Sequence, residues 1–151
     1  MNRKWLIIIV AGLSAALLDA IAAIVFLEVR PAMLLKFIAM GYYGKAAMQG
    51  GTDMIIWGVL FHVIIALWWA FFFVILWERL PLMRKNLPAT VVLYGLLIWV
   101  VMNLVVLPLS EVPPSPISFS SFWKSALILI AAVSLPIALI VRKAMRVKVR
   151  T

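Results

Sequence analysis

Four long apolar stretches constrain this sequence more than any other feature, and they span residues 5–27, 54–77, 89–107 and 122–141. A helix needs about 20 residues to cross about 30 Å of membrane hydrocarbon, and each stretch is close to or above that length. Hydrophobic residues make up 67% of the chain and charged residues only 13%, which excludes an ordinary water-exposed surface. We therefore predict an all-α integral membrane protein, a four-transmembrane-helix bundle that forms a single membrane domain over residues 1–151.

The basic residues predict which ends of the helices face the cytoplasm. With both termini inside, ten of the 14 lysines and arginines lie on the cytoplasmic side and four lie outside. Cytoplasmic loops carry an excess of lysine and arginine, so this orientation is favoured. The inside residues are then Arg3, Lys4, Arg79, Arg84, Lys85, Arg142, Lys143, Arg146, Lys148 and Arg150, and the outside residues are Arg30, Lys36, Lys45 and Lys124.

The same basic residues indicate a lipid partner. The cytoplasmic basic tail at residues 142–151 is expected to contact anionic lipid headgroups. We do not expect nucleic-acid binding, because the basic residues act as topological anchors at several helix ends rather than as one folded patch.

Two segments between the apolar stretches have their own character. Residues 28–53 are too apolar for a free loop and too rich in glycine for a fifth span, so we predict an outer interfacial segment with a helix that begins at Pro31. Residues 108–121 hold several prolines among serines, which predicts a stiff outer loop, either a lid or docking strap or a plain solvated connector. The short segment between the second and third stretches predicts that these two helices are antiparallel neighbours.

Small residues recur at helical spacing along the first stretch. Gly12, Ala16 and Ala20 are four residues apart, and Ala11 and Ala15 belong to the neighbouring row. Small side chains allow helix backbones to approach closely in a membrane, where lipid provides no hydrophobic drive for helix association. This row therefore predicts a close-packing face on the first helix.

Three polar residues inside the apolar stretches are the candidates for a functional site: Asp19, His62 and Asn103. At about 1.5 Å per residue, Asp19 and His62 each lie about 12 Å from the outer ends of their helices, and Asn103 lies about 6 Å from the outer end of its helix. We therefore predict that Asp19 pairs with His62 and that the three side chains form a polar cluster that opens toward the outside. An ionisable residue within a membrane span indicates a functional site by default.

Several roles fit this polar cluster. Hydrogen bonds between the helices can simply determine their register, whereas a histidine, which titrates near neutral pH, also suits a proton relay or a substrate site. A haem is compatible only with a second ligand beside His62, because the chain has one histidine and no cysteine. The spacings match no catalytic or metal-ligand signature, so we expect neither an enzyme nor a metal site, and the sequence requires no cofactor.

Three further side chains are candidates for lining a cavity in the bundle: Trp69, Trp99 and Ser134. Trp69 lies along the same helix as the histidine and Trp99 comes one turn before the asparagine, although plain packing also explains both. Pro136 is expected to kink the last helix and to free a backbone carbonyl that Ser134 or a neighbour must satisfy.

A set of short motifs is spread over the chain from about residue 44 to residue 139. The motifs are Gly44-Lys45, Ala47, Gly50-Gly51, Gly58, His62, Ile65-Ala66, Trp69, Tyr94-Gly95, Met102-Asn103, Val106, Pro108-Leu109-Ser110 and Leu135-Pro136-Ile137-Ala138-Leu139. In these motifs the sequence resembles the uncharacterised YagU-like family of small bacterial four-helix inner-membrane proteins. This resemblance implies a location in the bacterial inner membrane and an unassigned activity, and it implies that His62 and Asn103 belong to a recurring pattern.

Two classes of function follow from these observations. The small size, the minimal soluble parts and the lack of a catalytic constellation favour a structural or accessory subunit of a larger membrane complex. The alternative is an oligomeric small transporter or channel that uses Asp19 and His62 as a proton-titrating site. An enzyme that acts on lipid has the thinnest support of the three, because no nucleophile or metal set accompanies these two residues. The expected partners are therefore other membrane proteins or further copies of this chain.

Overall fold

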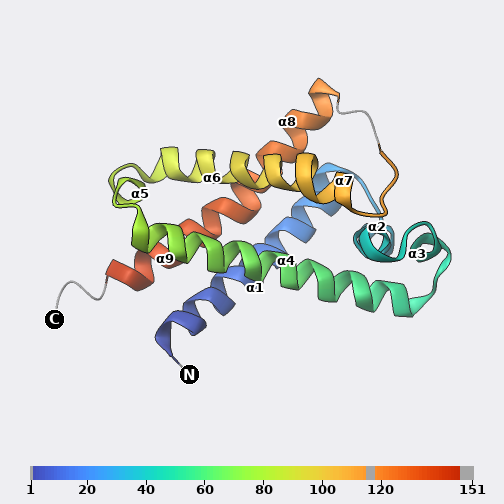
Figure 1. Cartoon of the computed structure of the whole chain (residues 1–151), viewed down its shortest axis with the longest axis horizontal. Helices are drawn as coiled ribbons and strands as arrows, with labels where there is room; N and C mark the ends of the chain where they lie inside the picture. The colour runs from blue at the N-terminus through green and yellow to red at the C-terminus, as the bar shows by residue number, and fades with distance from the viewer. Residues whose placement is uncertain (1, 115–117, 147–151) are drawn as a thin grey trace.

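The chain folds as a series of helices in a computed structural model that describes residues 2–114 and 118–146 (Figure 1). Pro116 of the predicted outer loop lies outside the described residues, as do Lys148 and Arg150 of the predicted basic tail. The elements are α1 (Arg3–Phe26), α2 (Pro31–Tyr43), α3 (Ala46–Gln49), α4 (Thr52–Arg79), α5 (Leu82–Lys85), α6 (Leu87–Val101), the π-helical segment η1 (Met102–Val106), α7 (Leu107–Leu109), α8 (Phe119–Ile128), the π-helical segment η2 (Leu129–Ser134) and α9 (Leu135–Arg146).

Within the described residues, four helical stretches are long and apolar enough to cross a membrane, which confirms the predicted number of spans. The third stretch joins α6, η1 and α7 into one continuous helix, and the fourth joins α8, η2 and α9. Their bounds lie within a few residues of the predicted ones. The four stretches are Arg3–Phe26, Thr52–Arg79, Leu87–Leu109 and Phe119–Met145.

The loop before the fourth span is shorter than the predicted range of residues 108–121. Pro108 lies in α7, the last turn of the third span, and the fourth span already begins at Phe119. Proline can stay in this helix because the wider π-helical turn of η1 comes directly before it and relieves the clash with the preceding turn. At the other end of the loop, the Ser118 hydroxyl caps α8 by accepting a hydrogen bond from the backbone N–H of Ser121 at 3.1 Å.

Both π-helical segments end directly before a leucine-proline pair. The backbone N–H of Leu107 donates to the carbonyl of Met102, and the N–H of Leu135 donates to the carbonyl of Ile130, so each bond spans five residues. A proline has no N–H and its ring collides with the carbonyl four residues earlier in an α-helix. Each wide turn therefore lets its helix continue through the proline, and the fourth span passes through Pro136 in this way.

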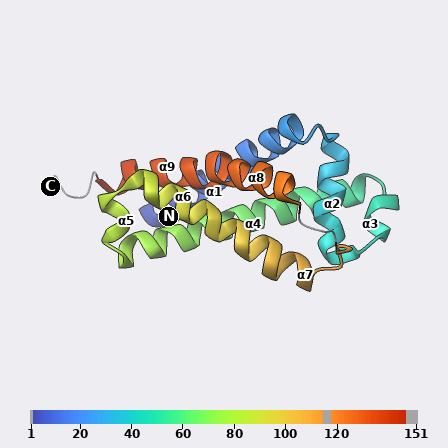
Figure 2. The ribbon, with the colours of Figure 1, turned by 90° about the horizontal axis from the view of Figure 1, so that it is seen from above.

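The four spans pack into a bundle with two different ends. Helix α1 packs along α4, η2 and α9, α6 packs against η2, and α2 crosses α4. The connected helices α4 and α6 meet through large side chains, with the rings of Phe73 and Tyr94 4.8 Å apart. In Figures 1 and 2, α2 and α3 lie at one end of the bundle, and α5 lies at the other with the end of α9. We call these the cap end and the hairpin end.

Glycines bring the helix backbones into close contact. A Cβ atom added at Gly12 would lie 2.9 Å from the Cα of Leu67 on α4, and one at Gly95 would lie 2.8 Å from the Cα of Ile130 in η2. The predicted close-packing face of the first helix is confirmed for most of its small residues, which are buried against the neighbouring helices, whereas Ala20 is half-buried. The buried small residues of α1 are Ala11, Gly12, Ala15, Ala16 and Ala23.

The cap consists of α2, α3 and residues 110–112. Helix α2 begins at Pro31 as predicted, and it ends at Gly44, whose φ of 60° suits glycine. The backbone N–H of Glu111 donates to the carbonyl of Gly41 at 3.1 Å, which ties the segment after α7 to α2. A small apolar core holds the three pieces together and consists of Ala39, Met40 and Ala47, with Tyr43, Met48, Met54 and Val112 packed against it.

Candidate functional site

A cavity of about 460 Å³ lies directly under the cap. Its walls come from α1, α2, α4, the end of α6, η1 and η2, and residues of the cap segment after α7 close it from above. This volume falls within the range of about 300–1,000 Å³ that is typical of ligand sites. Most of the wall is apolar, and the side chains with hydrogen-bonding groups are Asp19, Tyr42, His62, Trp69 and Ser110.

The structure brings Asp19 and His62 together in this cavity. They project from α1 and α4, and the Nε2 atom of His62 lies 3.9 Å from the Oδ2 atom of Asp19. Both side chains keep a small exposed fraction, 16% for His62 and 22% for Asp19, so both are reachable from the cavity. The close approach of α1 to α4 at Gly12 and Leu67 positions the two helices for this contact.

The hydrogen bond of His62 determines which groups the pair offers to a ligand. Its Nε2 lies 2.9 Å from the backbone carbonyl oxygen of Ala16. A carbonyl can only accept, so Nε2 carries the hydrogen, and in the neutral ring Nδ1 is an acceptor. The distance of 3.9 Å to Asp19 is too long for a hydrogen bond, and within the described residues no hydrogen bond reaches the Asp19 carboxyl group. The site therefore presents a carboxyl group whose oxygens are available.

Asn103 has a partner on its own helix instead of in the pair. Its side-chain amide donates to the carbonyl of Trp99, four residues earlier, at 3.0 Å, and the wall of the cavity does not include it. Trp99 is also absent from the wall, because its indole N–H donates to the Ser125 hydroxyl at 2.8 Å and its ring packs against Phe122. The structure thus brings together two of the three predicted cluster residues.

Trp69 lines the cavity, whereas Ser134 does not. The hydroxyl of Ser134 is fully buried and donates to the carbonyl of Val91 on α6 at 2.7 Å, so it joins two helices. Of the two predicted partners for the carbonyl freed by Pro136, Ser134 or a neighbour, Ser134 is therefore not the one. The backbone carbonyl of Trp69 accepts a hydrogen bond of 2.6 Å from the hydroxyl of Tyr94. Trp69 therefore lies where the cavity meets the packed half of the bundle.

No protein-family model, curated protein or solved structure matches this chain. The resemblance to the YagU-like family therefore stays a prediction from the residues. The function of this chain must be inferred from the geometry of its own side chains.

Aromatic side chains that the sequence did not predict reach the cavity from the cap end. The rings of Tyr42 and Phe61 lie 6.0 Å apart, and both line the cavity. Tyr43 and Trp57 pack against Phe61 at 6.4 Å and 5.6 Å. The available signal was the pair of adjacent tyrosines between two glycines, but a role at the membrane interface explained such aromatic residues equally well.

The described residues contain no group of three or more His, Cys, Asp or Glu side chains that could hold a metal ion. A haem at His62 would need a second ligand, as the sequence indicates.

The tautomer of His62 can be checked directly, because the chain has a single histidine. In the neutral ring we expect the hydrogen on Nε2, which donates to Ala16. Nitrogen NMR of protein labelled in histidine distinguishes the protonated ring nitrogen from the bare one. A ring with its hydrogen on Nδ1 would contradict the assigned contact.

Proposed function

We propose that this chain is a small polytopic membrane protein that binds an amphiphilic molecule in the cavity under the cap. The observation that carries the proposal is the pair of Asp19 and His62 in a wall that is otherwise almost wholly apolar. An apolar cavity with a few convergent polar groups is the usual form of a small-molecule site. The apolar wall would bind the hydrophobic body of the molecule, and the pair would bind its polar group.

The charges of the wall favour a cationic polar group. None of the described residues that line the cavity is a lysine or an arginine, and the Asp19 carboxyl group has oxygens available to a ligand. The aromatic rings of Tyr42, Phe61 and Trp69 lie in the same wall, and aromatic faces attract cations. A lipophilic amine or quaternary cation is therefore the ligand class that fits this site.

We favour an accessory role in a larger membrane complex. Below the cavity, toward the hairpin end, the bundle is filled by buried side chains, including Phe73, Tyr94 and Ile137. This packing supports a role in binding the amphiphile rather than in passing it through the bundle. An accessory subunit that holds an amphiphile for a partner protein agrees with both the cavity and the filled bundle below it.

The proposed location is the bacterial inner membrane, with both termini in the cytoplasm. The excess of basic residues at the hairpin end supports this orientation, and the family resemblance supports the location. In this orientation the cavity lies in the outer half of the membrane, so its ligand would enter from the outer leaflet.

The first test of this function is purification from the native membrane in mild detergent. We expect mass spectrometry to find stoichiometric partner proteins and a retained amphiphile, and an absorption spectrum would reveal any pigment. A colourless homo-oligomer without partners or retained molecules would contradict the accessory role.

A small oligomeric transporter is the second candidate function. The observation that favours it is the 3.9 Å separation of two groups that can both ionise, Asp19 and His62. If the pair couples transport to protons, His62→Gln should abolish the pH dependence of transport between about pH 5 and pH 8. The measurement is transport into proteoliposomes by the His62→Gln variant and by the original protein. If transport depends on pH equally in both, the proton-coupling hypothesis is wrong.

A further inference from the structure

A second pocket lies at the hairpin end, the end of the bundle opposite to the cavity under the cap. Its volume is about 420 Å³, and it is formed by the start of α1, the end of α4, the segment at α5 and helix α9. Its wall combines charged side chains with an apolar floor. The charged residues are Arg3, Lys4, Glu78, Arg84 and Arg142, and the floor includes Ile7, Trp77, Ala144 and Met145.

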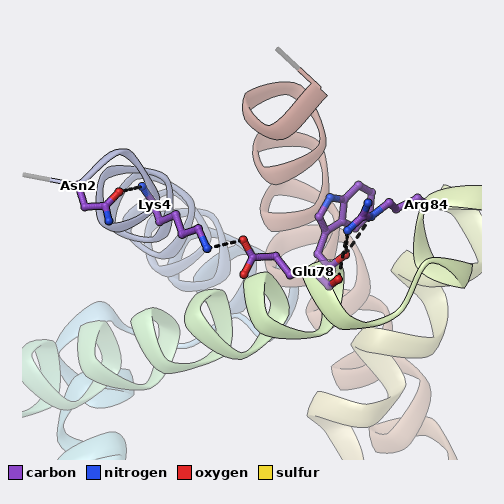
Figure 3. Close-up of polar contacts among 5 residues, drawn as sticks. Asn2, Lys4, Glu78 and Arg84 are labelled. Carbon is purple, nitrogen blue, oxygen red and sulfur yellow. Dashed lines mark hydrogen bonds and ion pairs between the residues drawn. The ribbon is translucent and has the colours of Figure 1, made fainter. Parts of the chain in front are cut away.

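The pocket carries an excess of positive charge. Four basic residues and one acidic residue line it, which gives a formal charge of +3. Lys4 on α1 and Glu78 on α4 form an ion pair of 2.7 Å, so each neutralises the other (Figure 3). Three arginines remain to balance the charge of a ligand, and arginine suits phosphate because its planar donors match the phosphate oxygens.

Backbone contacts hold two of these arginines in place. Nε and Nη2 of Arg84 donate to the carbonyl of Trp77 at 3.0 Å and 2.8 Å, so Arg84 reaches back over the end of α4, as Figure 3 shows. Nη2 of Arg3 donates to the carbonyl of Ala144 at 3.0 Å. A guanidinium group has five N–H donors, so each arginine keeps donors for a ligand after these bonds. Their side chains are ordered before a ligand binds, which lowers the entropic cost of binding.

The position of the pocket indicates which kind of anion it can bind. Its wall comes from the ends of three of the four apolar helices, α1, α4 and α9, and helix ends lie at the level of lipid headgroups when the helices cross a membrane. Exposed apolar side chains of α1, among them Trp5 and Leu6, lie next to it and continue toward the middle of the bundle. A molecule bound here can place a phosphate among the arginines and acyl chains along α1.

We propose that this pocket is a binding site for the phosphate group of an acidic phospholipid. The site is separate from the cavity under the cap and does not depend on the ligand proposed there. Basic pockets between membrane helices bind lipid headgroups in this way, with about 1 kcal/mol for each basic residue near the surface.

The test compares the purified protein with two double variants of equal charge change. Arg3→Gln with Arg142→Gln removes two cations from the pocket, whereas Arg79→Gln with Lys85→Gln removes two exposed cations of the same end that do not line it. Binding of phosphatidylglycerol is measured by native mass spectrometry, with phosphatidylcholine as the neutral lipid. We expect about thirtyfold weaker binding for the pocket variant and little change for the control variant, as two basic residues at about 1 kcal/mol each predict.

Two further measurements test the lipid site even if the pocket variant does not fold. Glu78→Gln frees Lys4 from its ion pair and should tighten phosphatidylglycerol binding about fivefold. Glycerol phosphate, which has a phosphate but no acyl chains, should not displace phosphatidylglycerol when both are present at the same concentration. Equal losses in both double variants, weaker binding by Glu78→Gln, or full competition by glycerol phosphate would each overturn the lipid site.

Discussion

Replacing Gly58 with leucine is expected to separate α2 from α4 and to cause a large loss of stability. A Cβ atom at position 58 would lie 2.6 Å from the carbonyl carbon of Leu35 and 2.9 Å from its Cα. These are backbone atoms of α2, which cannot rotate away as the end of a side chain can. Overpacking in a tight site costs about 1–3 kcal/mol, and we expect this substitution to lower the free energy of unfolding by about 3 kcal/mol.

The loss is measured as the free energy of unfolding in mixed micelles. The matched control is Gly41→Ala, because a Cβ there would have its nearest contact at 3.9 Å, from the Cβ of Ser110. Alanine is a better helix former than glycine by about 1 kcal/mol, so this change should leave stability equal or slightly higher. Equal stability of the Gly58→Leu variant and the original protein would show that α2 does not pack on α4 as described.

Replacing Asp19 with asparagine is expected to weaken the binding of a lipophilic cation by about ten- to a hundredfold. The carboxyl group lies in an apolar wall, and none of the described residues donates a hydrogen bond to it. Two opposite unit charges about 6 Å apart attract by about 3 kcal/mol at an effective dielectric constant of about 20, and about 1.4 kcal/mol corresponds to a factor of ten in affinity. Asparagine keeps the shape of the side chain and cannot carry a negative charge, so the change isolates the electrostatic contribution.

The probe is tetraphenylphosphonium, and its binding to the purified protein is measured by equilibrium dialysis. Tetraphenylborate has a similar shape and the opposite charge, and in a separate dialysis without the cation it should bind more weakly. Asp53→Asn is the control variant, because Asp53 lies in the exposed first turn of α4 and does not line the cavity. Equal affinities of the Asp19→Asn and original proteins, or tetraphenylborate binding as tight as that of the cation, would refute a cation site at Asp19.

The helical spans could be predicted from the sequence because burial in lipid requires a long apolar stretch. The common depth of Asp19 and His62 followed from the constant rise of a helix, and the small residues of α1 indicated the face that brings α1 close to α4. These features depend only on local spacing along one helix. They transfer directly from sequence to structure.

The direction in which a side chain points was harder to predict. Asn103 lies in the π-helical segment η1, where each bond spans five residues, so the helix face on which it lies differs from that of an ideal α-helix. Ser134 and Trp99 bond to groups on other helices, Val91 and Ser125, and such partners depend on how the helices are rotated in the bundle. The cap is likewise a long-range feature, because it joins residues 110–112 to α2.

The most direct test of the cavity under the cap as a ligand site is to locate a bound amphiphile in the protein. A long-chain alkylamine with a photoactivatable diazirine would be reacted with the protein in membranes, and the labelled residues identified by mass spectrometry. We expect labels on α2 and α4 at cavity residues such as Ile38, Phe61 and Trp69, with protection by tetraphenylphosphonium and loss of labelling in Asp19→Asn. Labels spread over exposed side chains such as Trp68 and Leu93, without protection by the cation, would contradict a ligand site in this cavity.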